Sequence, residues 1–299
     1  MIGGSSYLGR YLHQESKGRD SSFAKAVWTH NENPLGYTRY LNILDNSRTE
    51  VLQVIGEQDL VLFLSGISEP SEVFGNASRA HETNVRGTQS LLSEVAKKGA
   101  SLIYFSSVEV FDGSAAPNNE NTEMNPLNIY GRMKMSNEQK ILSLFAPGKH
   151  CIVRTPWIVN PLLGSRCVIA QTLRGLEAGN MKFATDYLIS LVSAKLVLKN
   201  LEALVRNFLS NLPETLHFVS EGFISRHALA ERVNSMRTKP QKEVLAVQFH
   251  ELLLEEPRSS DTRMSTLYTW ASPFSSPDDI NSIVDEKMAI LQKGRNDRI

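Results

Sequence analysis

The chain has 299 residues, with 32 basic and 32 acidic side chains and a hydrophobic fraction of 41%. At about 150 residues per domain, this length predicts two domains, or one large domain with an appended lobe. The composition is typical of a folded protein with a sizeable core, and it excludes a disordered, collagenous or fibrous chain. The balanced charge gives no reason to expect nucleic acid or an anionic membrane as a partner.

The cysteine count, the length of the apolar runs and the N-terminal residues predict the cellular compartment of the protein. Cys151 and Cys167 are too few for a disulfide framework or a zinc site, and the seven histidines show no metal-ligand spacing. The most apolar run, residues 60–64, is far shorter than the ~20 residues that cross a bilayer. The N-terminus lacks the basic start and apolar segment of a signal peptide. We therefore expect a cytoplasmic protein in a reducing setting, with no metal and no membrane partner.

Short apolar runs alternate with helix-like stretches in the first 160 residues. Strands are predicted, in chain order, at residues 25–28, 60–64, 102–105 and 151–154. Between the second and third of these, residues 80–98 carry apolar side chains at helical spacing and end at Gly99, a typical helix stop. Strands separated by helices of this length predict an α/β fold with a doubly wound parallel sheet.

The regular alternation fades after about residue 160. Helices are predicted at residues 194–212, 227–236 and 278–292, and one strand at residues 216–219. A smaller lobe resting on the parallel sheet is the expected arrangement of this half.

A glycine-rich turn, Gly3-x-x-Ser6-x-x-Gly9, stands near the start of the chain. Glycines between a strand and a helix let the backbone approach a pyrophosphate, which then lies on the positive end of the helix. The middle position is a serine, and an ordinary glycine-rich turn is an equal alternative for this segment alone. The strand that should precede the turn is reduced to Met1 and Ile2, so we expect it to be missing or truncated unless another segment fills its place.

Three side chains form a candidate catalytic set. On a helix, Tyr130 and Lys134 share a face, so the phenol and the ammonium can point into one cleft. A nearby cation favours the phenolate, which makes tyrosine a better proton donor or acceptor near neutral pH. Ser107 ends the third predicted strand, where ligands of open parallel sheets bind, and its hydroxyl could bond a carbonyl oxygen. Taken singly, a surface Tyr–Lys pair and a serine that caps a strand are the simpler interpretations.

In the order glycine turn, strand-end serine and Tyr-x-x-x-Lys, the chain resembles the extended short-chain dehydrogenase/reductase family, closest to its dTDP-4-dehydrorhamnose reductase branch. The likeness is carried by residues 83–88 (Thr-Asn-Val-Arg-Gly-Thr), 106–113 (Ser-Ser-Val-Glu-Val-Phe-Asp-Gly), 125–134 (Asn-Pro-Leu-Asn-Ile-Tyr-Gly-Arg-Met-Lys) and 153–157 (Val-Arg-Thr-Pro-Trp). It implies a Rossmann-type dinucleotide-binding domain at residues 1–160. Residues 161–299 would then be mostly a substrate-binding lobe, with about 190–220 returning to the sheet.

The resemblance also implies roles for single residues. Tyr130 would give a proton to a ketone oxygen while reduced nicotinamide delivers hydride, Lys134 would bind the nicotinamide ribose and lower the pKa of Tyr130, and Ser107 would hold the carbonyl. The residues expected to bind the cofactor are Gly3, Ser6, Tyr7, Leu8, Gly9, His30, Asn42, Ile43, Ser65, Gly66, Ile67, Tyr130 and Lys134. Those expected to bind the substrate are Ser107, Val108 and Trp157.

The choice between NAD and NADP depends on the end of the second strand, where an acidic residue would pair with the ribose hydroxyls of NAD. His30 would favour the 2′-phosphate of NADP, and Glu32 would oppose it. We expect NADP or NAD, with NADP favoured.

The chain also departs from the family pattern. Ser6 replaces a glycine, Val108 replaces an aspartate and Glu109 replaces a tyrosine, while the hydride-transfer residues remain. We therefore expect a reductase of a keto group on a nucleotide-activated sugar or a similar small molecule. One alternative is an epimerase or dehydratase of the same family, with Glu109 as its acid or base. Another is a catalytically silent dinucleotide-binding subunit that regulates a partner, and homodimer formation also stays open.

Overall fold

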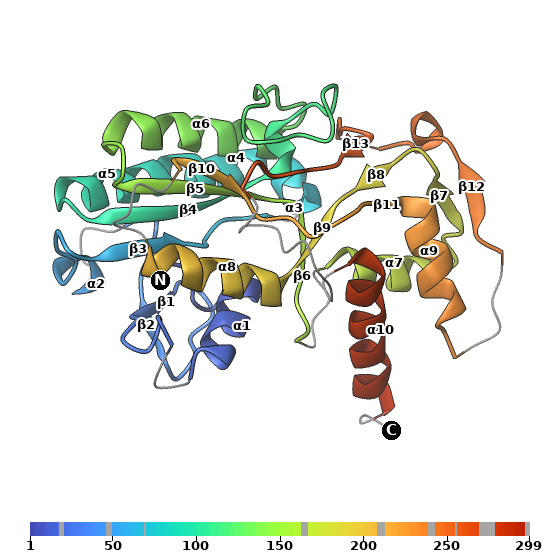
Figure 1. Ribbon diagram of the computed structural model, residues 1–299, viewed down its shortest axis with the longest axis horizontal. Helices are drawn as coiled ribbons and strands as arrows, with labels where there is room; N and C mark the ends of the chain where they lie inside the picture. Colours follow the sequence, from blue (N-terminus) through green and yellow to red (C-terminus); the bar gives the residue numbers. More distant parts are fainter. Residues whose placement is uncertain are drawn as a thin grey trace. The chain divides into compact units, whose positions relative to one another are not determined.

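The computed structural model describes residues 1–17, 21–45, 50–68, 70–162, 167–207, 213–238, 243–254, 256–268 and 279–296. The chain divides into two compact units, each built from several segments (Figure 1). The first unit comprises residues 1–110, 124–154 and 201–216, and the second unit comprises residues 111–123, 155–200 and 217–299.

A sheet forms the centre of the first unit. Four of its strands lie in the order β10 (Thr215–His217), β5 (His150–Thr155), β4 (Ser101–Ser107) and β3 (Leu60–Phe63). β3 and β4 are parallel, with Phe63 opposite Tyr104. A second parallel pair consists of β1 (Trp28–His30) and β2 (Thr38–Tyr40). β3 and β4 coincide with apolar runs of the sequence. Because both strand pairs are parallel and helices alternate with the strands, the predicted α/β class with a parallel sheet is confirmed.

Met1 and Ile2 lie between these two groups of strands. The amide of Ile2 donates to the carbonyl of Leu62 at 2.8 Å, and the carbonyl of Ile2 accepts from Leu64 at 2.9 Å. On the other side, the carbonyl of Met1 accepts from the amide of Thr29 at 3.1 Å. Ile2 forms an isolated parallel bridge rather than a full strand. These few bonds join β1 to β3 and place the glycine turn directly after them.

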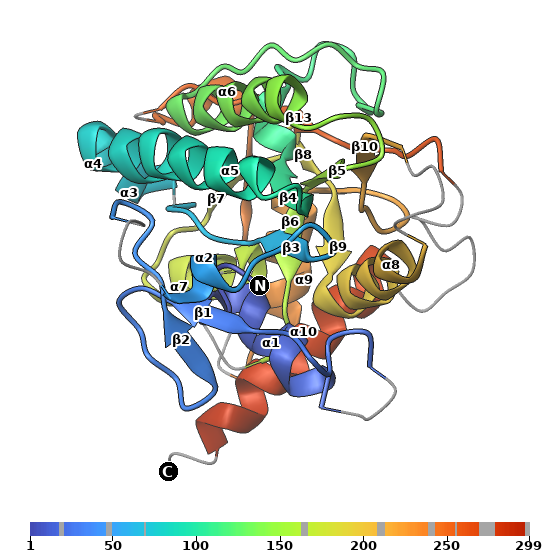
Figure 2. The same ribbon diagram turned by 90° about the vertical axis from the view of Figure 1, so that its left-hand side faces the viewer.

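Helices cover both faces of this sheet. α5 (Thr88–Lys97) and α6 (Ile129–Leu144) lie side by side on one face, and α1 (Tyr7–Glu15) lies on the other (Figures 1 and 2). Leu91, Leu92 and Leu102 are fully buried between α5 and the sheet. Each such side chain stabilises the fold by about 1.5–3 kcal/mol relative to an exposed one. Gly99 adopts a φ of +71° just after α5, which is why the helix ends there as predicted.

Two predicted elements differ from those observed. Residues 80–98 do not form one helix but α4 (Ala77–His81), the π-helical segment η1 (Glu82–Gly87) and α5. Hydrophobic spacing does not distinguish α from π turns, because the apolar face continues through both. The first predicted strand, at residues 25–28, begins only at Trp28, because the chain before it turns back on itself with Ala26 bonded to the carbonyl of Phe23.

The described part of the second unit is built from short strands and helices. Its parallel pairs are β6 (Trp157–Val159) with β9 (Leu191–Ser193), and β7 (Lys182–Ala184) with β12 (Leu245–Val247); β8 (Leu188–Ile189) lies between β11 (Ile224–Ser225) and β13 (Asp261–Thr262). Its helices are α7 (Val168–Glu177), α9 (Arg226–Ser235), α10 (Ile280–Asn296) and the first part of α8 (Ala194–Arg206).

The helices predicted in this half correspond to α8, α9 and α10, although residues 208–212 of the first prediction lie outside the described part. The remaining elements are the short helices α2 (Glu50–Gln53), α3 (Pro70–Gly75), η2 (Val108–Val110) and η3 (Phe249–Glu251). Within the described residues, none of the helices combines the length and apolar character needed to cross a membrane.

Candidate active site

The first turn of α6 is tied to the end of β4 by Asn128 and Glu109. Asn128 caps α6, because its Oδ1 accepts from the amide of Gly131 at 2.7 Å. Its Nδ2 donates to Oε2 of Glu109, in η2, at 2.5 Å. Because Tyr130 belongs to this same turn, the two bonds fix the position of its ring relative to the carboxyl end of β4.

Gly131 lets α6 approach the backbone of η2 closely. A Cβ atom at this position would lie 2.0 Å from the carbonyl oxygen of Glu109. We expect Gly131→Ala to lower the free energy of unfolding by about 1–3 kcal/mol, because α6 must move away from the rigid backbone. Urea unfolding measures this loss. Gly175→Ala in α7 is the matched control, since its nearest neighbour would lie 3.8 Å away; an equal loss in both variants would contradict the prediction.

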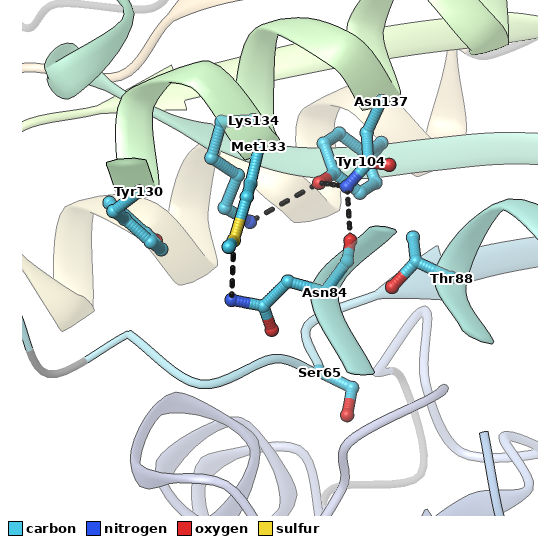
Figure 3. A pocket seen from close by; sticks show the side chains of 8 residues that line it. All are labelled: Ser65, Asn84, Thr88, Tyr104, Tyr130, Met133, Lys134 and Asn137. Atoms are coloured by element: carbon cyan, nitrogen blue, oxygen red, sulfur yellow. Dashed lines mark hydrogen bonds between the residues drawn. The ribbon is translucent and has the colours of Figure 1, made fainter. Parts of the chain in front are cut away.

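Tyr130 and Lys134 line the same small pocket (Figure 3). The other residues that line it are Ser65, Asn84, Thr88, Tyr104, Met133 and Asn137. They come from four places in the first unit: the loop after β3, η1 with the start of α5, strand β4, and the face of α6 turned toward the sheet. The i, i+4 pair predicted from the sequence thus faces one pocket.

The amino group of Lys134 is held by the strand below it. Its Nζ donates to the carbonyl of Phe105 at 2.7 Å and to the hydroxyl of Tyr104 at 3.3 Å. It also lies 5.7 Å from the centre of the Tyr130 ring. Burial lowers the pKa of Lys134 to about 8, and the negative charge of Glu138 partly opposes this shift. A fraction of this amine is therefore neutral at physiological pH.

Burial and the negative charge of Glu109 raise the pKa of Tyr130 above that of a free tyrosine. The net shift is therefore upward, opposite in direction to the lowering expected from Lys134. The physical reason is that burial disfavours the phenolate and also weakens the charge of the lysine that should stabilise it. Tyr130 is accordingly a neutral phenol near pH 7, which is the form that can donate a proton.

Asn84 fastens the loop after β3 to η1. Its Oδ1 accepts from the amide of Ile67 at 2.8 Å, and its Nδ2 donates to the carbonyl of Ile67 at 2.8 Å. Gly66 has a φ of +143°, and a Cβ there would lie 3.1 Å from Oδ1 of Asn84. These contacts fix the loop of Ser65, Gly66 and Ile67, three residues expected to contact the cofactor, beside the pocket.

The glycine turn retains the geometry that a pyrophosphate requires. Gly3 adopts a φ of +86°, and a Cβ at Gly9 would lie 2.5 Å from the carbonyl oxygen of Gly3, so α1 packs directly on the turn. Tyr7 and Leu8 begin α1, whose N-terminus is the positive end of the helix dipole. Ser6 caps the helix and its Oγ accepts from the amide of Gly9 at 3.1 Å. The turn therefore fits a dinucleotide, with one of its amides already bound by Ser6.

We expect Ser6→Gly to tighten the binding of NADPH by about tenfold. The substitution frees the amide of Gly9 for a phosphate oxygen, and a bond to a charged group contributes about 1.5 kcal/mol. Loss of the serine cap costs only a few tenths of a kcal/mol when glycine replaces it. Nicotinamide fluorescence measures the dissociation constant. Ser225→Gly, which removes the corresponding cap of α9, is the control; unchanged or weaker binding by Ser6→Gly would contradict the prediction.

The other residues expected to contact the cofactor lie at the end of β1 and just after β2. His30 ends β1, with its ring 6.0 Å from that of Tyr40. Asn42 accepts from the amide of Leu44 at 2.9 Å. Ile43 belongs to the buried core, so only its backbone can reach a ligand.

The residues expected to bind the substrate lie elsewhere than in the lining of the pocket. Ser107 ends β4 and its Oγ accepts from the amide of Glu109 at 3.3 Å. The side chain of Val108 is only 3% exposed, so any contact with a ligand must come from its backbone. Trp157 belongs to β6 of the second unit.

Sequence reasoning missed most of the lining of the pocket: Asn84, Thr88, Tyr104, Met133 and Asn137. One signal was available, because Asn137 follows Tyr130 by seven residues and Lys134 by three, and so shares their face of α6. Nothing in the spacing identifies Tyr104 or Asn84, because they come from a strand and a π-helical segment far away in the sequence.

The fold of the first unit and the Tyr130–Lys134 pair are those of the extended short-chain dehydrogenases/reductases. Within this class, the chain belongs to the RmlD substrate binding domain family, whose family model matches residues 1–286.

Two curated relatives and one solved structure are similar to the chain. Methionine adenosyltransferase 2 subunit beta of Xenopus tropicalis is 32% identical over 148 residues, which cover 48% of this chain and 42% of that subunit. A dTDP-4-dehydrorhamnose reductase of Mycobacterium tuberculosis is 27% identical over 227 residues, which cover 72% of this chain and 71% of the reductase. A dTDP-4-dehydrorhamnose reductase of Bacillus anthracis in complex with NADP has the same fold, with a TM-score of 0.74, 18% identity and coverage of 96% and 97%.

Proposed function

We propose that the chain is an NAD(P)-dependent reductase of a keto group on a nucleotide-activated sugar or a similar small molecule. The observation that carries this proposal is the shared pocket of Tyr130 and Lys134, with the amine anchored on the carbonyl of Phe105. The names of the reductases to which the chain is similar support the substrate class.

In this proposal each side chain has a defined task. A bound reduced nicotinamide would supply the hydride to the carbonyl carbon. Tyr130, a neutral phenol, donates its proton to the carbonyl oxygen. Lys134 binds the ribose of the cofactor and stabilises the phenolate that remains after the transfer. Ser107, at the end of β4, bonds the carbonyl oxygen, while Gly3, Ser6, Tyr7, Leu8 and Gly9 bind the pyrophosphate.

We favour NADPH over NADH as the reductant. Glu32, the residue that would repel a 2′-phosphate, pairs with Arg79 at 3.4 Å. The guanidinium offsets the carboxylate charge, and its remaining N–H groups can donate to a phosphate oxygen. This pair therefore supports NADP binding more than the sequence alone does.

A second candidate function is that of a dinucleotide-binding regulatory subunit without turnover. The similarity to methionine adenosyltransferase 2 subunit beta favours it. The epimerase or dehydratase alternative is weaker, because Glu109 is bonded to the cap of α6 and so has a structural task.

The test begins with titration of the purified chain with NADPH and NADH, followed by nicotinamide fluorescence. Turnover is then measured with a 4-keto nucleotide sugar by the loss of absorbance of the reduced cofactor. Tight NADPH binding with turnover is the expected result. Binding without turnover, together with altered activity of an added methionine adenosyltransferase catalytic subunit, would replace the reductase by the regulatory function. No binding of either cofactor would overturn both.

A further inference from the structure

A second phenol lies in the pocket of Tyr130 and Lys134. Tyr104, from β4, is only 1% exposed, and its hydroxyl lies between the side chains of Lys134 and Asn137 (Figure 3). The distances are 3.3 Å to Nζ of Lys134 and 3.0 Å to Nδ2 of Asn137. This hydroxyl has no place in the chemistry described so far, although it is bonded to the amine on which that chemistry depends.

The hydrogen atoms around this hydroxyl can be assigned. Asn137 has two amide hydrogens, and it donates one to the carbonyl of Asn84 at 2.6 Å and the other to Tyr104. Tyr104 therefore accepts one bond from Asn137 and keeps its own hydrogen. A hydroxyl oxygen accepts twice and donates once. Tyr104 can thus accept from Lys134 when the amine is charged, and donate to its lone pair when the amine is neutral.

The ability of Tyr104 to accept or donate is relevant because burial lowers the pKa of Lys134 to about 8. The amine therefore changes charge close to physiological pH. The carbonyl of Phe105, its other anchor, can only accept, so it holds the amine through an N–H in either form. Tyr104 is the anchor that adapts to both forms.

Other charged groups near this amine could also control its titration. From α6 these are Tyr130 and Glu138; from η2, Glu109, which acts on Tyr130; and from β5, Arg154, which is paired with Glu138. The charged pairs Glu82–Arg86 of η1 and Glu94–Lys97 of α5 are largely exposed to solvent. Tyr104 differs from these groups because its hydroxyl is bonded directly to Nζ of Lys134.

Tyr104 also packs in the core, with its ring 5.7 Å from that of Phe63. A packing role alone would be filled equally well by phenylalanine. We propose that Tyr104 is a positioning residue whose hydroxyl holds the amino group of Lys134 beside Tyr130 in both the charged and the neutral form of the amine. This role of Tyr104 rests on the proposed function only in its consequence for turnover.

Tyr104→Phe tests the proposal by the titration of Lys134 in the protein without cofactor. The Nζ resonance is followed by ¹⁵N NMR from pH 6 to 10 and assigned with Lys134→Arg. We expect the midpoint to fall by about 0.5–1 pH unit, because a bond to the ammonium is stronger than one to the neutral amine. If the chain reduces a keto sugar, the alkaline limb of kcat/KM should shift equally, with a loss of about two- to fivefold at pH 8 and little change in KM.

Tyr268→Phe in the second unit is the matched control, and its titration should equal that of the unaltered protein. An unshifted midpoint in Tyr104→Phe overturns the proposal, and so does the same shift in both variants. A shifted midpoint in a protein that lacks turnover supports the role of Tyr104 and contradicts only the reductase activity. Normal turnover with an unshifted midpoint contradicts only the role of Tyr104.

Discussion

Tyr130→Phe is expected to reduce kcat for the reduction of a keto sugar by about 100- to 10,000-fold, the range that a positioned general acid contributes. Phenylalanine keeps the ring that lies 5.7 Å from Nζ of Lys134 and removes only the proton donor. The dissociation constant for NADPH should therefore change by less than about threefold. Stopped-flow loss of NADPH absorbance measures the chemical step, and nicotinamide fluorescence measures binding.

The same tyrosine-to-phenylalanine change at Tyr268 controls for loss of a hydroxyl elsewhere, and it should leave kcat unaltered. A loss of less than tenfold in Tyr130→Phe would exclude Tyr130 as the proton donor. The donor would then be another group with a transferable proton, such as Ser107, Tyr104, Lys134 or a water molecule.

The sequence predicts the strands at the centre of the sheet well, because each is an apolar run bounded by turns. β3, β4 and β5 begin and end within two residues of the predicted runs. The π turn of η1 was not predicted; its Asn84 is bonded through its side chain to the backbone of Ile67, 17 residues away. Local pattern carries no information on such contacts.

In the candidate site, too, contacts between residues close in the sequence could be predicted and contacts between distant residues could not. Tyr130 and Lys134 are on one helix, so their spacing alone predicts that they face one cleft. The bonds that hold Lys134 come from Tyr104 and Phe105, which are 30 and 29 residues earlier in the chain. Their role depends on the packing of α6 over β4, and the burial that this packing produces also reverses the expected direction of the Tyr130 pKa shift.

Behind Lys134, the carboxylate of Glu138 pairs with the guanidinium of Arg154 on β5. The contact is 2.7 Å from Nη2 to Oε2, and the two side chains are only 1% and 6% exposed, respectively. Ser106 also donates to this carboxylate. Glu138 thus has a double role, because it joins α6 to β4 and β5 and its charge favours the ammonium form of Lys134.

Arg154→Met should lower the free energy of unfolding by about 3–5 kcal/mol at pH 7, because it leaves the carboxylate of Glu138 buried without its cation. Urea unfolding at pH 7 measures this loss. Arg206→Met, which breaks the exposed pair with Glu202, should cost at most about 1 kcal/mol. The double variant Glu138→Gln/Arg154→Met should recover part of the loss. A cost for Arg154→Met that matches that of Arg206→Met would show that the buried pair does not hold α6 on the sheet.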